Sequence, residues 1–303
     1  MEKKDKIHIA LAFDQNFIAP FYVLLTSIFL NNNEKQFVFH AIVEELDEKQ
    51  RELILFFVQQ NKAEILFYSV DAKLIKQFTL SVESPHITSA TYYRLFFPEL
   101  LSKDIDRLIY LDTDIIVIGE LDKLYHSSIE DSTIGAVADA KVRSRPDLGI
   151  VKEGEYFNAG VLLINLNQWR ELKITERTIK FLMTYPDKIL LADQDALNNV
   201  LLNNWYKLDK KYNITFYDVP NNLKKNQFDR FLNDKVIIHY TTQNKPWLLT
   251  CTNRLRYLYN LYLQKSPLAG SAVYADKNLR RRYIHKLFKR RLKELLIDWG
   301  ISV

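Results

Sequence analysis

Apolar and polar positions alternate with two different periods along the first third of the chain, and this predicts strands and helices in turn. Aliphatic runs typical of buried strands lie at 6–13, 37–43 and 63–70. Segments with helical periodicity lie between them at 21–32 and 47–61, and Asp47 is a suitable N-cap for the second. Strands and helices in this order predict a mostly parallel sheet flanked by helices.

The pattern after residue 88 is more mixed. A helical pattern interrupted by Pro98 covers 89–101, and the almost wholly aliphatic run 107–117 is typical of a buried strand. Further elements are predicted as strands at 132–139, 157–166 and 235–240 and as a helix at 193–203. A chain of 303 residues with 48% hydrophobic content suits one large α/β domain, with or without an appendage.

Two carboxylates, Asp112 and Asp114, interrupt the run at 107–117. Burying a carboxylate costs several kcal/mol unless something compensates its charge. If the strand continues, both side chains point to the same face, where they would offer oxygens to one hard cation such as Mn²⁺ or Mg²⁺. The alternative is an Asx turn that ends the strand without binding metal.

Open α/β sheets bind ligands at the carboxyl ends of their strands, and polar insertions fall at such ends at 14–16, at 112–114 and at His239. His239 is a candidate third ligand, since imidazole suits Mn²⁺ better than Mg²⁺, or else a hydrogen-bonded structural residue. Lys245 follows six residues later and would reach a diphosphate oxygen as a point charge.

The glycines, the single cysteine and the N-terminal region each argue against one feature: a phosphate-binding glycine loop, a disulfide and a targeting segment. None of the seven glycines forms GxGxxG or GxxxxGK, so a backbone cradle for phosphates is unsupported. The single cysteine, Cys251, excludes an intramolecular disulfide and fits a reducing cytoplasm. The apolar segment 17–30 is too short to span a bilayer and no small-residue cleavage site follows it, so we expect no targeting segment.

The positive charge of the chain belongs to its C-terminal tail. Residues 276–303 hold nine Lys or Arg against three Asp or Glu, a charge of +6, which leaves −1 for the rest of a chain of net charge +5. Apolar residues recur with helical spacing at 279, 283, 287, 288, 292, 295, 296 and 299. This predicts an amphipathic helix on an anionic membrane surface. The alternatives are a helix packed on the domain with a solvated basic face and, without a recognition module to support it, nucleic-acid binding.

Seven motifs occur in the order found in glycosyltransferase family 8, which the chain resembles: FDQNF, TYYRLFFPELL, LIYLDTDIIVIGEL, GAVADA, YFNAGVLLINLNQW, LADQDALN and IHYTTQNKPW. The similarity covers roughly 6–264 and is greatest to bacterial enzymes that build lipopolysaccharide or lipooligosaccharide, with glycogenin more distant. It implies a GT-A fold, a Rossmann-like mixed sheet, a UDP-glucose or UDP-galactose donor and Mn²⁺, with Mg²⁺ as the alternative. We therefore expect a catalytic domain at 1–264 and a basic membrane-association segment at 265–303.

The resemblance also implies a role for each matching residue. The metal ligands are Asp112, Asp114 and His239. The donor-binding residues are Ala12, Asp14, Asn16, Arg94, Asp112, Thr113, Asn158, Thr242 and Lys245. The residues expected around the reacting sugar are Gln194, Asp193, Asp139 and Arg94, with Gln194 beside the anomeric carbon.

Several of these positions also have a plainer interpretation. Asp14 would otherwise be a turn residue, Arg94 a surface arginine on a helix, Asn158 the cap of a strand and Asp193 the N-cap of the helix at 193–203. The family usually has glycine three residues after the histidine, where this chain has Thr242, which puts the contact of that loop with the diphosphate in doubt.

The expected activity is retaining transfer of a hexose to a glycolipid or other glycan at the cytoplasmic face of the membrane. Because the amide of Gln194 is a poor nucleophile, we favour front-face attack by the acceptor over double displacement. The alternatives are a protein acceptor and a catalytically idle scaffold that binds UDP-sugar. The complete set of Asp112, Asp114 and His239 argues against the scaffold.

Overall fold

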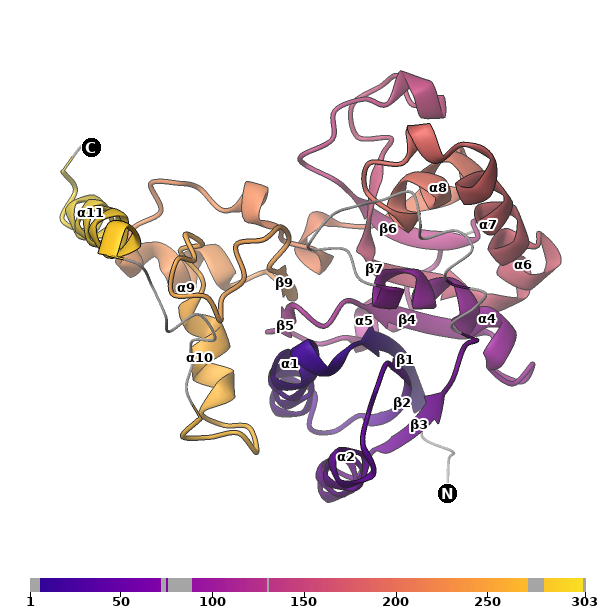
Figure 1. The fold of residues 1–303 in the computed structure, drawn as a ribbon, viewed down its shortest axis with the longest axis horizontal. Helices are drawn as coiled ribbons and strands as arrows, with labels where there is room; N and C mark the ends of the chain where they lie inside the picture. The colour runs from indigo at the N-terminus through magenta and orange to yellow at the C-terminus, as the bar shows by residue number, and fades with distance from the viewer. Residues whose placement is uncertain (1–5, 72–74, 76–88, 130, 272–280, 302–303) are drawn as a thin grey trace.

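A seven-stranded sheet with the strand order β3-β2-β1-β4-β7-β6-β8 forms the centre of the protein (Figure 1). The structure is a computed structural model that describes residues 6–71, 75, 89–129, 131–271 and 281–301. The strands of the sheet are β1 (Lys6–Phe13), β2 (Gln36–Val43), β3 (Glu64–Tyr68), β4 (Arg107–Leu111), β6 (Ile134–Ala138), β7 (Phe157–Asn165) and β8 (Trp205–Lys207).

Six strands of this sheet run in one direction, and β7 is antiparallel to its neighbours β4 and β6. Alternate side chains enter two separate cores, as the two-residue period of a strand requires. Leu108 and Tyr110 belong to one core, Ile109 and Leu111 to the other. Helices therefore cover both faces, and the predicted mixed, mostly parallel α/β sheet is confirmed.

The helices that flank the sheet and extend to the C-terminus are α1 (Ile18–Asn31), α2 (Glu48–Gln60), α4 (Phe97–Leu100), α5 (Asp122–Tyr125), α6 (Leu166–Glu171), α7 (Ile174–Thr184), α8 (Asp193–Val200), α9 (Phe228–Leu232), α10 (Tyr257–Leu263) and α11 (Arg281–Asp298). Asp47 is the N-cap of α2, as predicted, and accepts a hydrogen bond from the Gln50 amide at 2.7 Å. The α-helices and strands that lie outside the elements predicted from the pattern are α5, α6, α7, α9, α10 and β8.

Two predicted helices differ from the structure. The segment expected to be a helix at 89–101 is a 3₁₀ helix, η2 (Ser89–Phe96), followed by the short α4. Pro98 lies in the first turn of α4, where its missing N–H leaves no hydrogen bond unmade. The helix predicted at 193–203 ends at Val200, and its N-cap is Ala192 rather than Asp193.

The run at 107–117 is not one strand. It divides into β4 of the large sheet and β5 (Ile115–Val117), which pairs with β9 (Ile237–His239) in a second, two-stranded sheet. The Asp112 N–H donates to the Gly160 carbonyl at 2.8 Å, whereas the Asp114 carbonyl accepts from Tyr240 N–H at 2.9 Å. The chain therefore exchanges hydrogen-bond partners, and sheets, within the turn that carries both carboxylates.

The C-terminal helix α11 lies at the end of the molecule remote from the large sheet (Figure 1). Its two acidic residues face the body: Glu294 pairs with Arg256 at 2.6 Å, and Asp298 pairs with Arg254. Residues 272–280, which include the predicted apolar position Leu279, lie outside the described residues. Among the helices described, none is long and apolar enough to cross a membrane.

Candidate active site

A cavity of about 540 Å³ opens where β1 and β4 end, beside the small sheet. Asn16 is the one predicted site residue that does not line it; this exposed residue donates its N–H to the Asp14 carboxylate at 2.8 Å, which makes Asp14 a turn cap as well as a cavity residue. The structure brings the other predicted residues together around the cavity: Ala12, Asp14, Arg94, Asp112, Thr113, Asp114, Asp139, Asn158, Asp193, Gln194, Thr242, Lys245 and His239.

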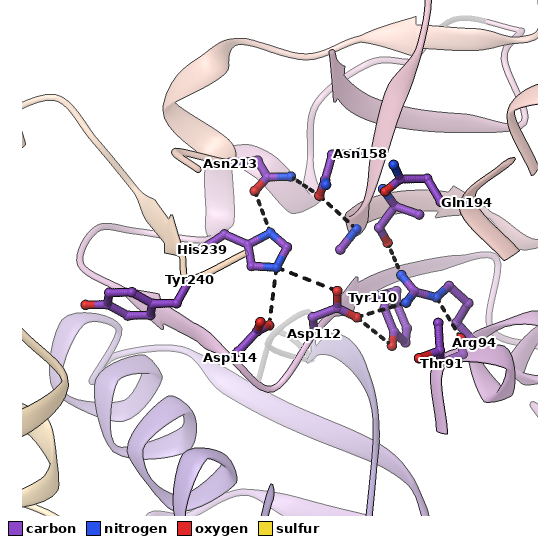
Figure 2. Close-up of polar contacts among 12 residues, drawn as sticks. Thr91, Arg94, Tyr110, Asp112, Asp114, Asn158, Gln194, Asn213, His239 and Tyr240 are labelled. Atoms are coloured by element: carbon purple, nitrogen blue, oxygen red, sulfur yellow. Dashed lines mark hydrogen bonds and ion pairs between the residues drawn. The ribbon is translucent and has the colours of Figure 1, made fainter. Parts of the chain in front are cut away.

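The three predicted metal ligands converge at one point (Figure 2). One ligand atom from each of Asp112, Asp114 and His239 lies within 4.8 Å of the others. His239 Nε2 is 3.2 Å from Asp114 Oδ1 and 3.7 Å from Asp112 Oδ2. The β5–β9 register pairs Ile115 with His239, which sets the imidazole beside Asp114. The turn, rather than a continuous strand face, brings the two carboxylates together.

This donor set fits a divalent cation. Two carboxylate oxygens and one imidazole nitrogen are ligands that Mn²⁺ accepts. Strand β7 contains a bulge between its pairings with β6 at Asn158 and Leu162, and the intervening Gly160 leaves room for the ligands. A Cβ on Gly160 would lie 2.2 Å from His239 Cε1 and 2.6 Å from Asp112 Oδ2. Gly160 was not among the predicted site residues, although a glycine inside a strand pattern is a sequence signal for such a close approach.

Lys245 and His239 compensate the charge of Asp114, the buried carboxylate of the turn. Burial alone would raise the pKa of Asp114, but the Lys245 ammonium and His239 hold that pKa well below its usual range. Lys245 bonds the Asp114 carboxylate and also donates to the Tyr240 carbonyl at 3.0 Å. The residue expected to contact the diphosphate thus lies directly beside the candidate metal ligands.

Arg94 is buried in the cavity wall, so its interpretation as a surface arginine is wrong. Its guanidinium lies 3.1 Å from Asp112 Oδ1 and 2.8 Å from Asp193 Oδ2, and it donates to the Ala159 carbonyl. Its Nε–H also donates to the Thr91 carbonyl at 3.0 Å (Figure 2). Arg94 therefore links the turn that carries Asp112 to the helix that carries Asp193.

Asp193 is a buried carboxylate that forms an ion pair with Arg94, whose Nε lies 2.8 Å from Oδ2. The Nε–H is directed to the Thr91 carbonyl, so this ion pair has no well-aligned hydrogen bond. Burial raises the pKa of Asp193 to about 7; the Arg94 guanidinium opposes this rise and the Asp112 charge adds to it. A ligand hydroxyl that reached this carboxylate would supply the missing donor.

Gln194 is fixed by hydrogen bonds at both ends of its amide. Its Oε1 accepts from the Ala159 N–H at 2.9 Å, and its Nε2 donates to Asp139 at 3.3 Å and to the Tyr156 hydroxyl at 3.2 Å. Asn158 also donates to Asp139, at 3.1 Å. These contacts hold the amide in one orientation and occupy its carbonyl oxygen.

The loop that carries Asp193 and Gln194 depends on residues outside the predicted set. Ala192 has a φ of 51°, a conformation rarely adopted by residues other than glycine. The fully buried Asp195 accepts hydrogen bonds from the Leu190 and Leu191 amides, each at 2.6 Å, and from the Tyr156 hydroxyl at 2.7 Å. Asp195 also pairs with Arg145 at 2.5 Å. The loop is thus anchored from behind the cavity.

Thr242 keeps the backbone conformation of the glycine that it replaces relative to the family pattern. Its φ is 74°, in the left-handed region that favours glycine. Its hydroxyl accepts a hydrogen bond from the Asn244 N–H at 3.2 Å, which compensates part of the conformational strain.

Comparison with known proteins agrees with the fold and the cavity. The family model "Glycosyl transferase family 8" matches residues 8–251. The chain is 32% identical to General stress protein A of Bacillus subtilis, over 82% of this chain and 89% of that protein. It is 27% identical to a lipopolysaccharide 1,2-glucosyltransferase of Escherichia coli K12, over 96% and 86%. It also matches the crystal structure of the galactosyltransferase LgtC with donor and acceptor sugar analogs, at a TM-score of 0.74 and 25% identity, over 92% of this chain and all of that one.

The fold and the cavity define a glycosyltransferase of the GT-A class. The chain belongs to glycosyl transferase family 8, as its motifs predicted. The roles assigned to individual cavity residues stay predictions.

The raised pKa of Asp193 predicts how stability changes with pH. An ordinary aspartate in the unfolded chain titrates near 3.9, so the folded state holds this proton more tightly up to pH 7. The contribution of Asp193 to the free energy of unfolding should therefore fall between about pH 4 and pH 7, by at most about 4 kcal/mol. Asp193→Asn removes this contribution, so the variant should gain stability relative to wild type as pH rises. Urea unfolding across this range measures the difference.

Asp229→Asn, at an exposed aspartate of α9, is the matched control and should differ from wild type by a constant amount. A pH-independent difference for Asp193→Asn as well would contradict the prediction.

Proposed function

We propose that this protein is a retaining, metal-dependent hexosyltransferase that transfers glucose or galactose from a UDP-sugar to a glycan of the lipopolysaccharide or lipooligosaccharide type. One observation carries the proposal: Asp112, Asp114 and His239 converge beside Lys245 in a cavity whose wall holds the buried carboxylate of Asp193. The names of the Escherichia coli relative and of the LgtC structure support a sugar-transfer reaction. Those names include both glucosyl and galactosyl transfer, so the proposal covers both donors.

We assign the two ends of the cavity to the two parts of the donor. Ala12 and Asp14, where β1 ends, are proposed to hold the uracil and ribose together with Asn16, which lies outside the cavity lining. Thr113 and Thr242 are proposed to contact the diphosphate. Asp112, Asp114 and His239 are proposed to bind Mn²⁺, with Mg²⁺ as the alternative, and the ion would neutralise diphosphate oxygens as charge develops. Lys245 adds a second positive charge there.

The sugar is proposed to lie against Asp193, Arg94, Asp139 and Asn158. Asp193 supplies buried acceptors for hydroxyl groups, and an unmet acceptor of this kind discriminates strongly in favour of a ligand that donates to it. Arg94 holds Asp193 in place through its ion pair. Gln194 lies beside them with its amide fixed by Asp139 and Ala159.

We propose front-face attack for the chemical step. The bond between the anomeric carbon and the phosphate oxygen breaks, the acceptor oxygen bonds to that carbon on the same face, and the acceptor proton passes to the departing phosphate. Double displacement would need a nucleophile below the carbon. The Gln194 carbonyl oxygen already accepts the Ala159 N–H and belongs to an amide, so it is a poor candidate.

We also propose that α11 associates with an anionic membrane surface at the cytoplasmic face. Its acids face the body, where Glu294 and Asp298 form ion pairs. The apolar residues of its outer face are exposed: Ile284, Phe288, Leu292, Leu295 and Trp299. Lys289, Arg290 and Lys293 are exposed on the same helix. A packed helix and a membrane-binding helix, which the sequence set as alternatives, are therefore compatible here.

The first prediction of the proposed function concerns metal-dependent turnover of the donor. The enzyme should release UDP from UDP-glucose or UDP-galactose in the presence of Mn²⁺, and Asp112→Asn or Asp114→Asn should reduce this by at least about a hundredfold, because each removes a charged ligand. Circular dichroism should be unchanged. Asp122→Asn, at the start of α5, is a matched control and should retain full activity. Near-normal turnover by either ligand variant would exclude the metal assignment.

The second prediction concerns Gln194. If it is not a nucleophile, Gln194→Ala should slow turnover yet leave a measurable rate, since only positioning contacts are lost. Mass spectrometry of the wild-type enzyme incubated with donor alone should find no glycosylated Gln194. A trapped adduct on this residue would replace front-face attack with double displacement.

The third prediction concerns α11. Replacing Phe288 and Trp299, which are 67% and 74% exposed, by serine should weaken flotation with phosphatidylglycerol vesicles about tenfold or more, because each apolar side chain contributes about 1.5–3 kcal/mol on burial. The melting temperature should not change. Wild-type binding should also weaken with salt, since about 0.1 M salt screens charges over about 10 Å.

Phe56→Ser removes an equally exposed aromatic residue from α2 and is the control for this pair; it should not alter flotation. Unaltered flotation of the double variant would refute membrane association through α11.

A further inference from the structure

Asn213 is a buried residue that belongs to none of the motifs identified in the sequence. It follows the 3₁₀ turn η5 (Lys210–Tyr212), and 1% of its surface is exposed. Its side-chain amide lies between His239 and Asn158 (Figure 2). The next residue, Ile214, exchanges backbone hydrogen bonds with β9, through Ile237 O and His239 N, each at 2.9 Å. Asn213 and the imidazole are thus held in fixed register by the backbone.

The orientation of the Asn213 amide follows from neighbouring groups that can act only as hydrogen-bond donors or only as acceptors. The Gly160 N–H can only donate, so the Asn158 atom 3.1 Å from it is the oxygen. Asn158 then presents its nitrogen to the Asp139 carboxylate at 3.1 Å, which can accept it. The Asn213 atom 2.9 Å from the Asn158 oxygen must therefore be its nitrogen. Asn213 consequently turns its oxygen toward His239 Nδ1, at 3.0 Å.

An oxygen at that position selects one form of the histidine. Nδ1 must carry a proton to donate to the Asn213 oxygen, so the neutral ring has its lone pair on Nε2. Nε2 is the atom that faces Asp114 at 3.2 Å and Asp112 at 3.7 Å. With the proton on Nε2 instead, the ring would bond Asp114 and could not coordinate an ion.

We propose that Asn213 is a positioning residue that sets the tautomer of His239 and so prepares Nε2 to bind the divalent cation. The inference rests on the metal site of the proposed function. Partners of this kind, behind a metal-binding histidine, typically change metal affinity by about 10- to 100-fold when they are removed. The same amide connects His239, through Asn158, to Asp139 and Gln194 on the sugar side of the cavity.

The test reads the tautomer directly in the metal-free protein. Two-bond ¹H–¹⁵N correlation spectra of ¹⁵N-histidine-labelled enzyme, recorded at about pH 8.5 where an ordinary histidine is neutral, distinguish a protonated from a bare ring nitrogen. The chain has six histidines, and His239→Gln identifies the signal. Wild-type His239 should carry its proton on Nδ1. Asn213→Ala should move a measurable fraction of it to Nε2.

Asn213→Asp is the conservative variant. It keeps an oxygen that accepts from Nδ1 but loses the donor to Asn158, so it should retain the wild-type tautomer. Asn253→Ala is the matched control, since Asn253 is also buried but bonds the Leu255 amide outside the cavity. It should lower the melting temperature without changing the His239 signals, which separates loss of packing from loss of positioning.

Mn²⁺ affinity, measured from the electron paramagnetic resonance signal of the free ion, gives the second readout. The Kd should rise about 10- to 100-fold in Asn213→Ala and stay unchanged in Asn253→Ala. A wild-type Nδ1 without a proton, or the same tautomer in Asn213→Ala as in wild type, would overturn the inference whatever the activity; a second proton on Nε2, which faces the Asp114 carboxylate in the metal-free protein, would not. A wild type that shows the expected tautomer but does not bind Mn²⁺ would instead overturn the metal assignment in the proposed function.

Discussion

The structure of the cavity depends on holding several carboxylates close together inside a folded protein. Asp112, Asp114, Asp139 and Asp193 all line it, and two unit charges about 4 Å apart repel by roughly 4 kcal/mol in a partly buried setting. Each carboxylate is compensated in a different way. Lys245 bonds Asp114, Arg94 lies between Asp112 and Asp193, and Asp139 accepts amide protons from Asn158 and Gln194. The side chains of Lys245, Arg94, Asn158 and Gln194 are thus placed where they compensate carboxylate charge.

The same requirement explains the irregular backbone of this region. The chain leaves the large sheet at Leu111, turns through the two carboxylates and joins β9, which brings Asp114 beside His239. The bulge in β7 keeps the opposite wall free of a side chain at Gly160. The positive φ of Ala192 turns Asp193 into the cavity, and hydrogen bonds to the buried Asp195 carboxylate hold that turn. Ala192 and Thr242 are the two residues of the described cavity lining, other than glycine, that have a positive φ.

The sequence predicted those features that neighbouring residues determine. The strand at 6–13 and the capped helix after Asp47 have their signals within one segment, and the structure agrees with both. The division of 107–117 between two sheets was missed because it depends on remote partners, Gly160 and Tyr240. The convergence of Asp14, the 112–114 turn and His239 was expected from their position after strands, whereas the other cavity residues were expected from the family resemblance. No local sequence pattern predicted the role of Asn213, because that role depends on its contacts with the side chains of His239 and Asn158.

The turn between β4 and β5 also has a consequence for the stability of the protein. Asp112 follows a strand of the seven-stranded sheet, whereas His239 ends a strand of the two-stranded sheet. An ion bound by both residues would connect the two sheets. A ligand at a hundred times its Kd adds about 2.7 kcal/mol to the stability of the state that binds it. Under the proposed metal assignment, the concentration of the ion and the stability of the contact between the two sheets would be thermodynamically linked.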